Sequence, residues 1–147
     1  DGQHLITTHG FGAEEAEQAL TAFITGCEDK SQLPTAILAG GDYMAFGAVN
    51  ALNKLNMSVP DNVSVMSMDG FNLADIHDVP LTAVHVPRDE LGAEAIQLLQ
   101  RRLLRPDAPF SNTLLQGKLV ACSSVKQINQ KRAMPAAKKP SDQLYDL

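Results

Sequence analysis

The chain has 147 residues, of which 44% are hydrophobic and 20% are charged, a composition typical of a globular domain with its own core rather than of a disordered chain. Its formal net charge of −5 leaves no overall electrostatic footprint for nucleic acid. No apolar run approaches the roughly 20 residues that span a membrane, and no signal peptide is visible. These totals exclude a membrane-spanning protein and a strongly basic nucleic-acid binder.

The first elements are predicted from apolar periodicity. Residues 5–8 form a short β-branched run that predicts a strand, and residues 9–12 interrupt it. Residues 13–27 follow with apolar side chains at helical spacing and with Glu14 and Glu15 in the first turn, where the helix dipole favours negative charge. We therefore expect a strand followed by an amphipathic helix.

The central stretch, residues 34–60, predicts a strand, a glycine turn and a second helix. The strand covers residues 35–39, Gly40 and Gly41 make the turn, and Asp42 is expected to cap a helix over residues 43–55. An inward stripe is expected from Met44, Ala48, Ala51, Leu52 and Leu55. Three further apolar residues lie partly off that stripe, namely Tyr43, Phe46 and Val49. Either a partner subunit covers this second face, or the helix is buried on two sides of its own domain.

The remaining elements continue the alternation. Residues 63–68 predict a strand, residues 73–77 a short helical turn, and residues 81–86 an extended segment. The longest helix is expected over residues 88–104, and residues 114–121 predict a final strand or pair of strands. Residues 127–147 are polar and predict a flexible tail. Alternation of strands and helices at these lengths predicts an α/β protein with a mainly parallel sheet.

Three loops are expected at the carboxyl edge of that sheet, where ligands bind in open α/β proteins. Phe11 follows the first strand, Gly41 the second and Asp69 the third. A stacking aromatic and a carboxylate that accepts two hydroxyl hydrogen bonds suit a sugar or nucleoside site. The structural alternatives are that Phe11 packs onto the following helix and that Asp69 caps the next turn.

Motifs for catalysis or metal binding are missing from the sequence. There is no nucleophile elbow, no phosphate-binding P-loop, no Cys-x-x-Cys and no His-Glu-x-x-His. The histidines fall on separate elements, and Cys27 and Cys122 have no metal-ligand spacing. We expect no enzyme, no catalytic residue, no metal and no cofactor, and two free thiols that mildly favour a reducing compartment.

Several motifs, in order, resemble the LacI/GalR family of bacterial repressors. They are Pro34-Thr35-Ala36-Ile37 followed by Gly41-Asp42-x-Met44-Ala45-x-Gly47-Ala48, then Val59-Pro60-Asp61-Asn62-Val63-Ser64-Val65, then Pro80-Leu81-Thr82-Ala83-Val84 with Pro87 and Glu90-Leu91-Gly92-x-x-Ala95, and finally Leu119-Val120-x-x-Ser123-Ser124-Val125. The resemblance runs without gaps from about residue 5 to residue 125.

The resemblance implies a type I periplasmic-binding-protein-like fold, a parallel sheet flanked by helices, of which this chain holds mostly the C-terminal subdomain. It implies a partial effector-binding domain over residues 1–126, with residues 1–84 and 112–126 in the C-terminal subdomain. Residues 88–106 would belong to the N-terminal subdomain, with the hinge crossed near residues 84–87. The first strand and helix of the C-terminal subdomain, the early part of the N-terminal subdomain and the DNA-binding headpiece are not matched by any part of the sequence.

The resemblance also implies site residues. Phe11 matches an effector-stacking aromatic, Asp69 an effector-binding acid, Gly41 a position that often carries a polar effector contact, and Arg88 a position near the effector from the other subdomain. The implied dimer interface comprises Tyr43, Phe46, Val49, Leu73 and His77. The sequence departs from the family pattern at Ser67-Met68-Asp69-Gly70 and at Ala121-Cys122.

The expected function is therefore effector sensing and dimerisation in a cytoplasmic LacI/GalR-type repressor. A sugar or nucleoside-like effector between the subdomains would shift a hinge that controls operator binding. The expected partners are that small molecule, a second copy in a homodimer or higher oligomer, and DNA through a headpiece outside this sequence. The alternative is a periplasmic sugar-binding protein of a transport system. The sequence identifies neither the effector nor the operator, and it does not show whether the effector acts as an inducer or as a co-repressor.

Overall fold

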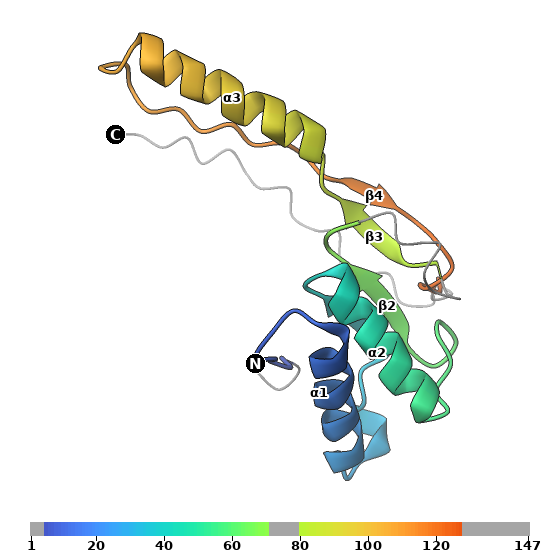
Figure 1. The fold of residues 1–147 in the computed structure, drawn as a ribbon. Coiled ribbons are helices and arrows are strands. Elements are labelled where there is room, and N and C mark those ends of the chain that lie inside the picture. Colours follow the sequence, from blue (N-terminus) through green and yellow to red (C-terminus); the bar gives the residue numbers. More distant parts are fainter. Residues whose placement is uncertain (1–4, 71–79, 128–147) are drawn as a thin grey trace, which may run out of the picture.

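The computed structural model describes residues 5–70 and 80–127 and shows a four-stranded sheet with helices beside it (Figure 1). The strands β1 (Ala36–Ala39), β2 (Ser64–Ser67), β3 (Thr82–His85) and β4 (Lys118–Val120) lie side by side in that order. β1 pairs with β2 and β2 with β3 in parallel, whereas β4 is antiparallel to β3. The predicted fold class, a mainly parallel α/β sheet, is confirmed.

Two helices build the core on the sheet. α2 (Asp42–Lys54) packs against β1 and β2, and α1 (Ala13–Gly26) packs against α2. The core cluster joins side chains from all four elements and from the turn before β2, including Leu20, Ala39, Val49, Leu52, Val63 and Val65. Both helices match their predictions to within one residue at either end, because their apolar side chains recur at the helical period.

The 3₁₀ turn η2 (Lys30–Gln32) connects α1 to β1. Its N-cap is Asp29, whose carboxylate accepts a hydrogen bond of 2.9 Å from the Ser31 backbone N–H. Hydrogen bonds from the Ser31 side chain and backbone lower the pKa of Asp29 below its usual value. This cap was not predicted from the sequence.

Two local predictions are wrong. Residues 5–8 join no sheet, because a strand needs a neighbour for its main-chain groups and a groove separates this segment from β1. Asp42 does not cap α2: Gly41 is the N-cap residue, Asp42 is the first helical residue, and its side chain turns towards β2. The predicted strand at residues 114–121 is shortened to β4.

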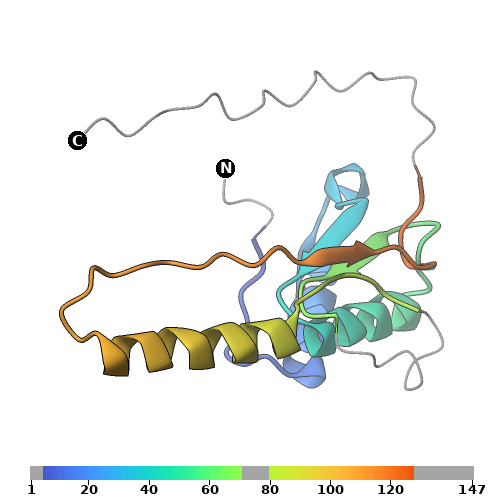
Figure 2. The same ribbon diagram turned by 90° about the horizontal axis from the view of Figure 1, so that it is seen from above.

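The helix α3 (Arg88–Leu104) stands away from the sheet. It matches its predicted bounds, but none of its residues is buried and no other described helix or strand packs against it. Figure 2 shows that α3 and the segment that follows it extend together away from the sheet before the chain returns at β4. Arg102 stabilises the loop in which the chain turns back after α3. Its Nη1 donates hydrogen bonds to the carbonyls of Pro106 and Ala108 at 2.8 and 2.9 Å. Its guanidinium also lies 4.4 Å from the Phe110 ring centre.

Candidate functional site

The candidate site lies where β1 and β2 end. Ala39 pairs with Ser67 in the parallel ladder, so the turns that follow the two strands start at the same edge of the sheet. Gly41 and Asp42 come from the first turn, and Asp69 and Gly70 from the second. This adjacency was predicted from the alternation of elements.

Asp69 is the residue around which the others gather. Its backbone carbonyl accepts hydrogen bonds from Arg88 Nη2 at 2.7 Å and from the Val86 N–H at 3.4 Å. Its carboxylate lies beside Gly41: a Cβ at that position would be only 2.8 Å from Asp69 Oδ2. The structure therefore brings together three of the four predicted effector residues, Asp69, Gly41 and Arg88.

Gly41 leaves room for the Asp69 carboxylate. Its backbone is extended, with φ −163° and ψ 166°, so glycine is not required here for conformation. What a side chain would change is the space beside Asp69, and the carboxylate would have to turn away. Gly41 thus determines how Asp69 is presented without contributing polar atoms of its own side chain.

Phe11 stands apart from this group. Its side chain is 84% exposed, on the loop that precedes α1. The alternative that Phe11 packs onto the following helix is wrong, because so exposed a ring buries almost no surface. The alternative role of Asp69 as a cap concerns residues 71–79, which lie outside the described part of the chain, as do Leu73 and His77.

Asp42 has a role that the sequence analysis missed. Its side chain is 3% exposed, and its Oδ1 accepts hydrogen bonds from Ser67 Oγ and, at 3.2 Å, from the Gly70 N–H. A signal was present in the sequence: Ser67 continues the alternation of Val63 and Val65, so a polar residue occupies a core position. A hydroxyl there requires a buried partner, and Asp42 supplies it.

Gly70 closes the turn in the left-handed region. With φ +58°, it takes a conformation that favours glycine, and a Cβ would lie 2.2 Å from the His85 ring. His85 at the end of β3 therefore covers one side of the Asp69–Gly70 peptide. No function was predicted for His85 from the sequence.

The predicted dimer residues differ in accessibility. Tyr43 is 58% exposed, whereas Phe46 is 7% exposed and Val49 is completely buried in the core cluster. For Phe46 and Val49 the structure supports the alternative of a helix buried on two sides of its own domain. Of the described interface candidates, Tyr43 is the one with a substantially exposed side chain.

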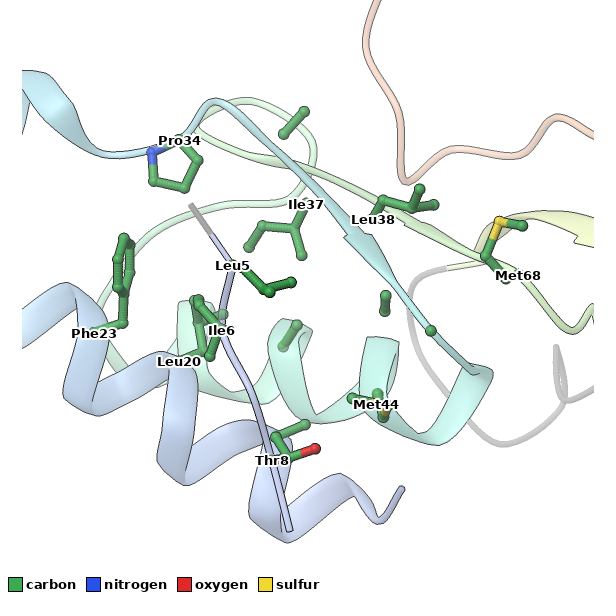
Figure 3. Close-up of a pocket in the computed structure, with 15 residues that line it drawn as sticks. Leu5, Ile6, Thr8, Leu20, Phe23, Pro34, Ile37, Leu38, Met44 and Met68 are labelled. Carbon is green, nitrogen blue, oxygen red and sulfur yellow. The ribbon is translucent and has the colours of Figure 1, made fainter. Parts of the chain in front are cut away.

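An apolar groove of about 550 Å³ lies between residues 5–8 and β1 (Figure 3). Leu5, Ile6 and Leu20 line it from the helical side, and Ile37, Leu38 and Met68 from the sheet. Its lining lacks charged groups and none of the four predicted effector residues belongs to it. It reaches Gly40 and Met68, the residues that precede Gly41 and Asp69 in the chain.

Within residues 5–70 and 80–127, no group of three or more His, Cys, Asp or Glu side chains is placed to hold a metal ion. Cys27 and Cys122 are free thiols. None of the described helices combines the length and the apolar character needed to cross a bilayer.

Comparison with known proteins places this geometry in a family. Residues 3–125 match the periplasmic binding protein-like domain. The chain belongs to the family of periplasmic-binding-protein-like domains, and its predicted similarity to LacI/GalR-family regulators is confirmed by the named relatives.

Curated relatives are repressors. The chain is 33% identical over 108 residues to the HTH-type transcriptional repressor PurR of Glaesserella parasuis, covering 69% of this chain and 32% of that protein. It is 40% identical over 73 residues to the ribose operon repressor of Escherichia coli, covering 50% of this chain and 22% of the repressor. The chain thus spans at most about a third of these two relatives' length.

Solved structures agree with the assignment. A LacI family regulator from an Arthrobacter species, solved in complex with lactose, has a TM-score of 0.71 at 30% identity over 83% of this chain and 45% of its own. A LacI family regulator from Enterococcus faecalis, solved with bound ribose, has a TM-score of 0.71 at 25% identity over 85% of this chain and 44% of its own.

Proposed function

We propose that this chain is the effector-sensing part of a LacI/GalR-type transcriptional repressor. The observation that carries the proposal is the carboxyl edge of the sheet, where Asp69 is held by Arg88 and lies against the side-chain-free Gly41. A carboxylate with an open neighbour can accept hydrogen bonds from two hydroxyl groups of a ligand.

The ligand class is a sugar or a nucleoside-like molecule. Lactose and ribose are bound in two similar regulators, and the Escherichia coli relative is a ribose operon repressor. Phe11 is proposed to complete the site by stacking on the ligand, for which its exposed ring is available. Ligand binding would therefore order Phe11 as well as engage Asp69.

The sensing step is proposed to be a hinge movement between two subdomains. Residues 1–84 and 112–126 would form the C-terminal subdomain and residues 88–106 a segment of the other. Arg88, the first residue of α3, reaches back to the Asp69 carbonyl at 2.7 Å, so this hydrogen bond would span the two. An effector that binds more tightly to one closure would shift the equilibrium towards it.

The regulatory output is proposed to need a second copy and DNA. A homodimer or higher homo-oligomer would place the exposed Tyr43 at the subunit contact, and a DNA-binding headpiece outside this sequence would read the operator. Such a repressor would act in the cytoplasm. A helix-turn-helix upstream would support this assignment, whereas a signal peptide there would instead indicate a periplasmic transport protein.

Substitution of Asp69 tests the site. We expect Asp69→Ala to lower affinity for the ligand at least tenfold, because each hydrogen bond to a charged group contributes about 1.5–3 kcal/mol. Calorimetric titrations with D-ribose, lactose and adenosine measure the affinity in the full-length protein.

Asp107→Ala is the matched control, since Asp107 is an exposed loop residue on the return from α3. It should bind as the unaltered protein does. Equal affinity of the Asp69→Ala variant would show that the site is wrong, and failure of all three molecules to bind the unaltered protein would contradict the proposed ligand class.

A further inference from the structure

We infer that Asp42 is a positioning residue for the effector site, which fixes the direction of the Asp69 carboxylate by holding the peptide that follows it. The inference rests on the proposed function, in which Asp69 contacts the ligand. Asp42 itself is buried beneath this turn and is not proposed to touch the ligand.

The Asp69–Gly70 peptide is held at both of its polar groups. Its carbonyl accepts from Arg88 Nη2 at 2.7 Å, and its N–H donates to Asp42 Oδ1 at 3.2 Å. Because a peptide unit is planar, two hydrogen bonds at its two ends fix its rotation. The backbone at Asp69 is therefore oriented, and with it the bond from which the carboxylate projects.

The burial of Asp42 argues against a role as an ordinary helix cap. The N-cap of α2 is Gly41, and Asp42 Oδ1 accepts from Ser67 Oγ and the Gly70 N–H, which belong to other elements, whereas a cap would accept from the N–H groups of its own helix. Burying a carboxylate is unfavourable unless it is hydrogen-bonded, and the bonds from Ser67 Oγ and Gly70 N–H come from the end of β2 and the turn after it. The positive end of the α2 dipole adds support for the charge.

Neighbouring groups limit the alternatives for this peptide. Gly70 has φ +58°, and the His85 ring occupies the space where a side chain at this position would begin. On the other side, the Gly41 backbone lies against the Asp69 carboxylate. Loss of the Asp42 bond therefore releases one end of the peptide while Arg88 and Val86 still hold the other, and Asp69 can rotate.

The test compares Asp42→Ala with Asp42→Asn in the 147-residue chain. Asn keeps an amide oxygen that can accept the Gly70 N–H, whereas Ala removes the acceptor. In Asp42→Ala we expect Gly70 amide exchange to accelerate at least about tenfold, the Asp69 side-chain ¹³C signal to move, and D-ribose affinity to fall at least about tenfold. Asp42→Asn should restore most of all three.

Gly47→Ala serves as the control for lost stability, because it strains the α1–α2 contact away from this turn. It should leave the Gly70 and Asp69 signals unchanged. Unchanged Gly70 exchange and Asp69 signals in both Asp42 variants would overturn the inference. If Asp42→Ala does not fold, an Asp42→Asn variant that loses the Gly70 protection while the Asp69 signal stays in place would also overturn it. D-ribose affinity is measured in the full-length protein, where absence of binding to the unaltered form would count against the proposed ligand and leave the two spectroscopic measurements to decide on Asp42.

Discussion

Ser124, in the segment that follows β4, connects that segment to two strands through one buried hydroxyl group. Its Oγ donates to the Val65 carbonyl at 2.6 Å and accepts from the Thr82 N–H at 2.8 Å, and the side chain is completely buried. The Ser124 carbonyl also accepts from the Val65 N–H at 2.9 Å. One small residue thus bonds backbone groups of both β2 and β3.

Ser124→Ala is expected to lower the free energy of unfolding by about 1–3 kcal/mol, because the buried Thr82 N–H and Val65 carbonyl each lose a partner. Urea denaturation followed by circular dichroism measures this change. Ser123→Ala, one residue away and exposed, should stay within about 0.5 kcal/mol of the unaltered chain. Equal midpoints for the two variants would contradict the assigned role.

At this residue scale, sequence reasoning predicted three of the residues that gather at the site, but it also placed Phe11 there and did not predict how the residues interact. Asp69, Gly41 and Arg88 were found from strand ends and family motifs, and the structure places them together. The orientation of Asp42 was not found, because the same Asp at a helix start suits a cap as well as a buried acceptor. Choosing between these two roles requires knowing that Ser67 and Gly70 lie beside Asp42, which depends on the tertiary structure.

The contact between α1 and α2 depends on a single glycine. A Cβ at Gly47 would lie 2.1 Å from the Ala13 carbonyl oxygen and 2.9 Å from the Ala16 Cβ. Since the first of these is a backbone atom, the clash can be relieved only by moving a helix. Glu17 and Lys54 form a salt bridge between the same two helices.

Gly47→Ala should therefore destabilise the chain by about 1–3 kcal/mol or more, as overpacking does. Gly92→Ala is the matched control, because a Cβ at Gly92 in the exposed α3 meets nothing within 4 Å. That change should stabilise by roughly 0.5–1 kcal/mol through helix propensity. Denaturation midpoints of the two variants that shift in the same direction would contradict the packing argument.

Helices were more predictable than strands for a physical reason. The bounds of α3 follow from local periodicity and from the acidic first turn, although no other described helix or strand packs on it. A strand exists only where a neighbour pairs with it, so a β-branched run at residues 5–8 was not enough. The antiparallel direction of β4 likewise depends on where the chain returns after α3.

At the scale of the molecule, many large apolar side chains are exposed in the described part of the chain. On α3, Leu99 is 55% exposed and Leu103 73% exposed, and Phe110 and Leu114 on the returning segment are almost fully exposed. The groove beside β1 adds a second apolar surface. Extended patches of this kind promote association or reduced stability.

We therefore expect the isolated chain to associate with increasing concentration and to melt broadly at a modest temperature. Replacing both Leu99 and Leu103 with Glu should reduce association, as measured by size-exclusion chromatography with light scattering. Replacing Gln97 and Gln100 with Glu adds the same charge on the same helix without removing apolar surface, and should reduce it less. A monomer at all concentrations with a sharp, high-temperature transition would contradict this expectation.

The pairing of β3 with β4 restricts how α3 can move. The chain leaves for α3 through β3 and comes back through β4, and the two strands are joined at Ala83–Val120, Val84–Leu119 and His85–Lys118. Because β3 and β4 are hydrogen-bonded to each other, they can twist and bend together, but neither strand can slide along the other without breaking the hydrogen bonds between them. We therefore expect any displacement of α3 relative to the sheet to be mainly a rotation about an axis near these strands. Arg88, the first residue of α3 and three residues after the end of β3, is the side chain whose reach to Asp69 such a rotation would change.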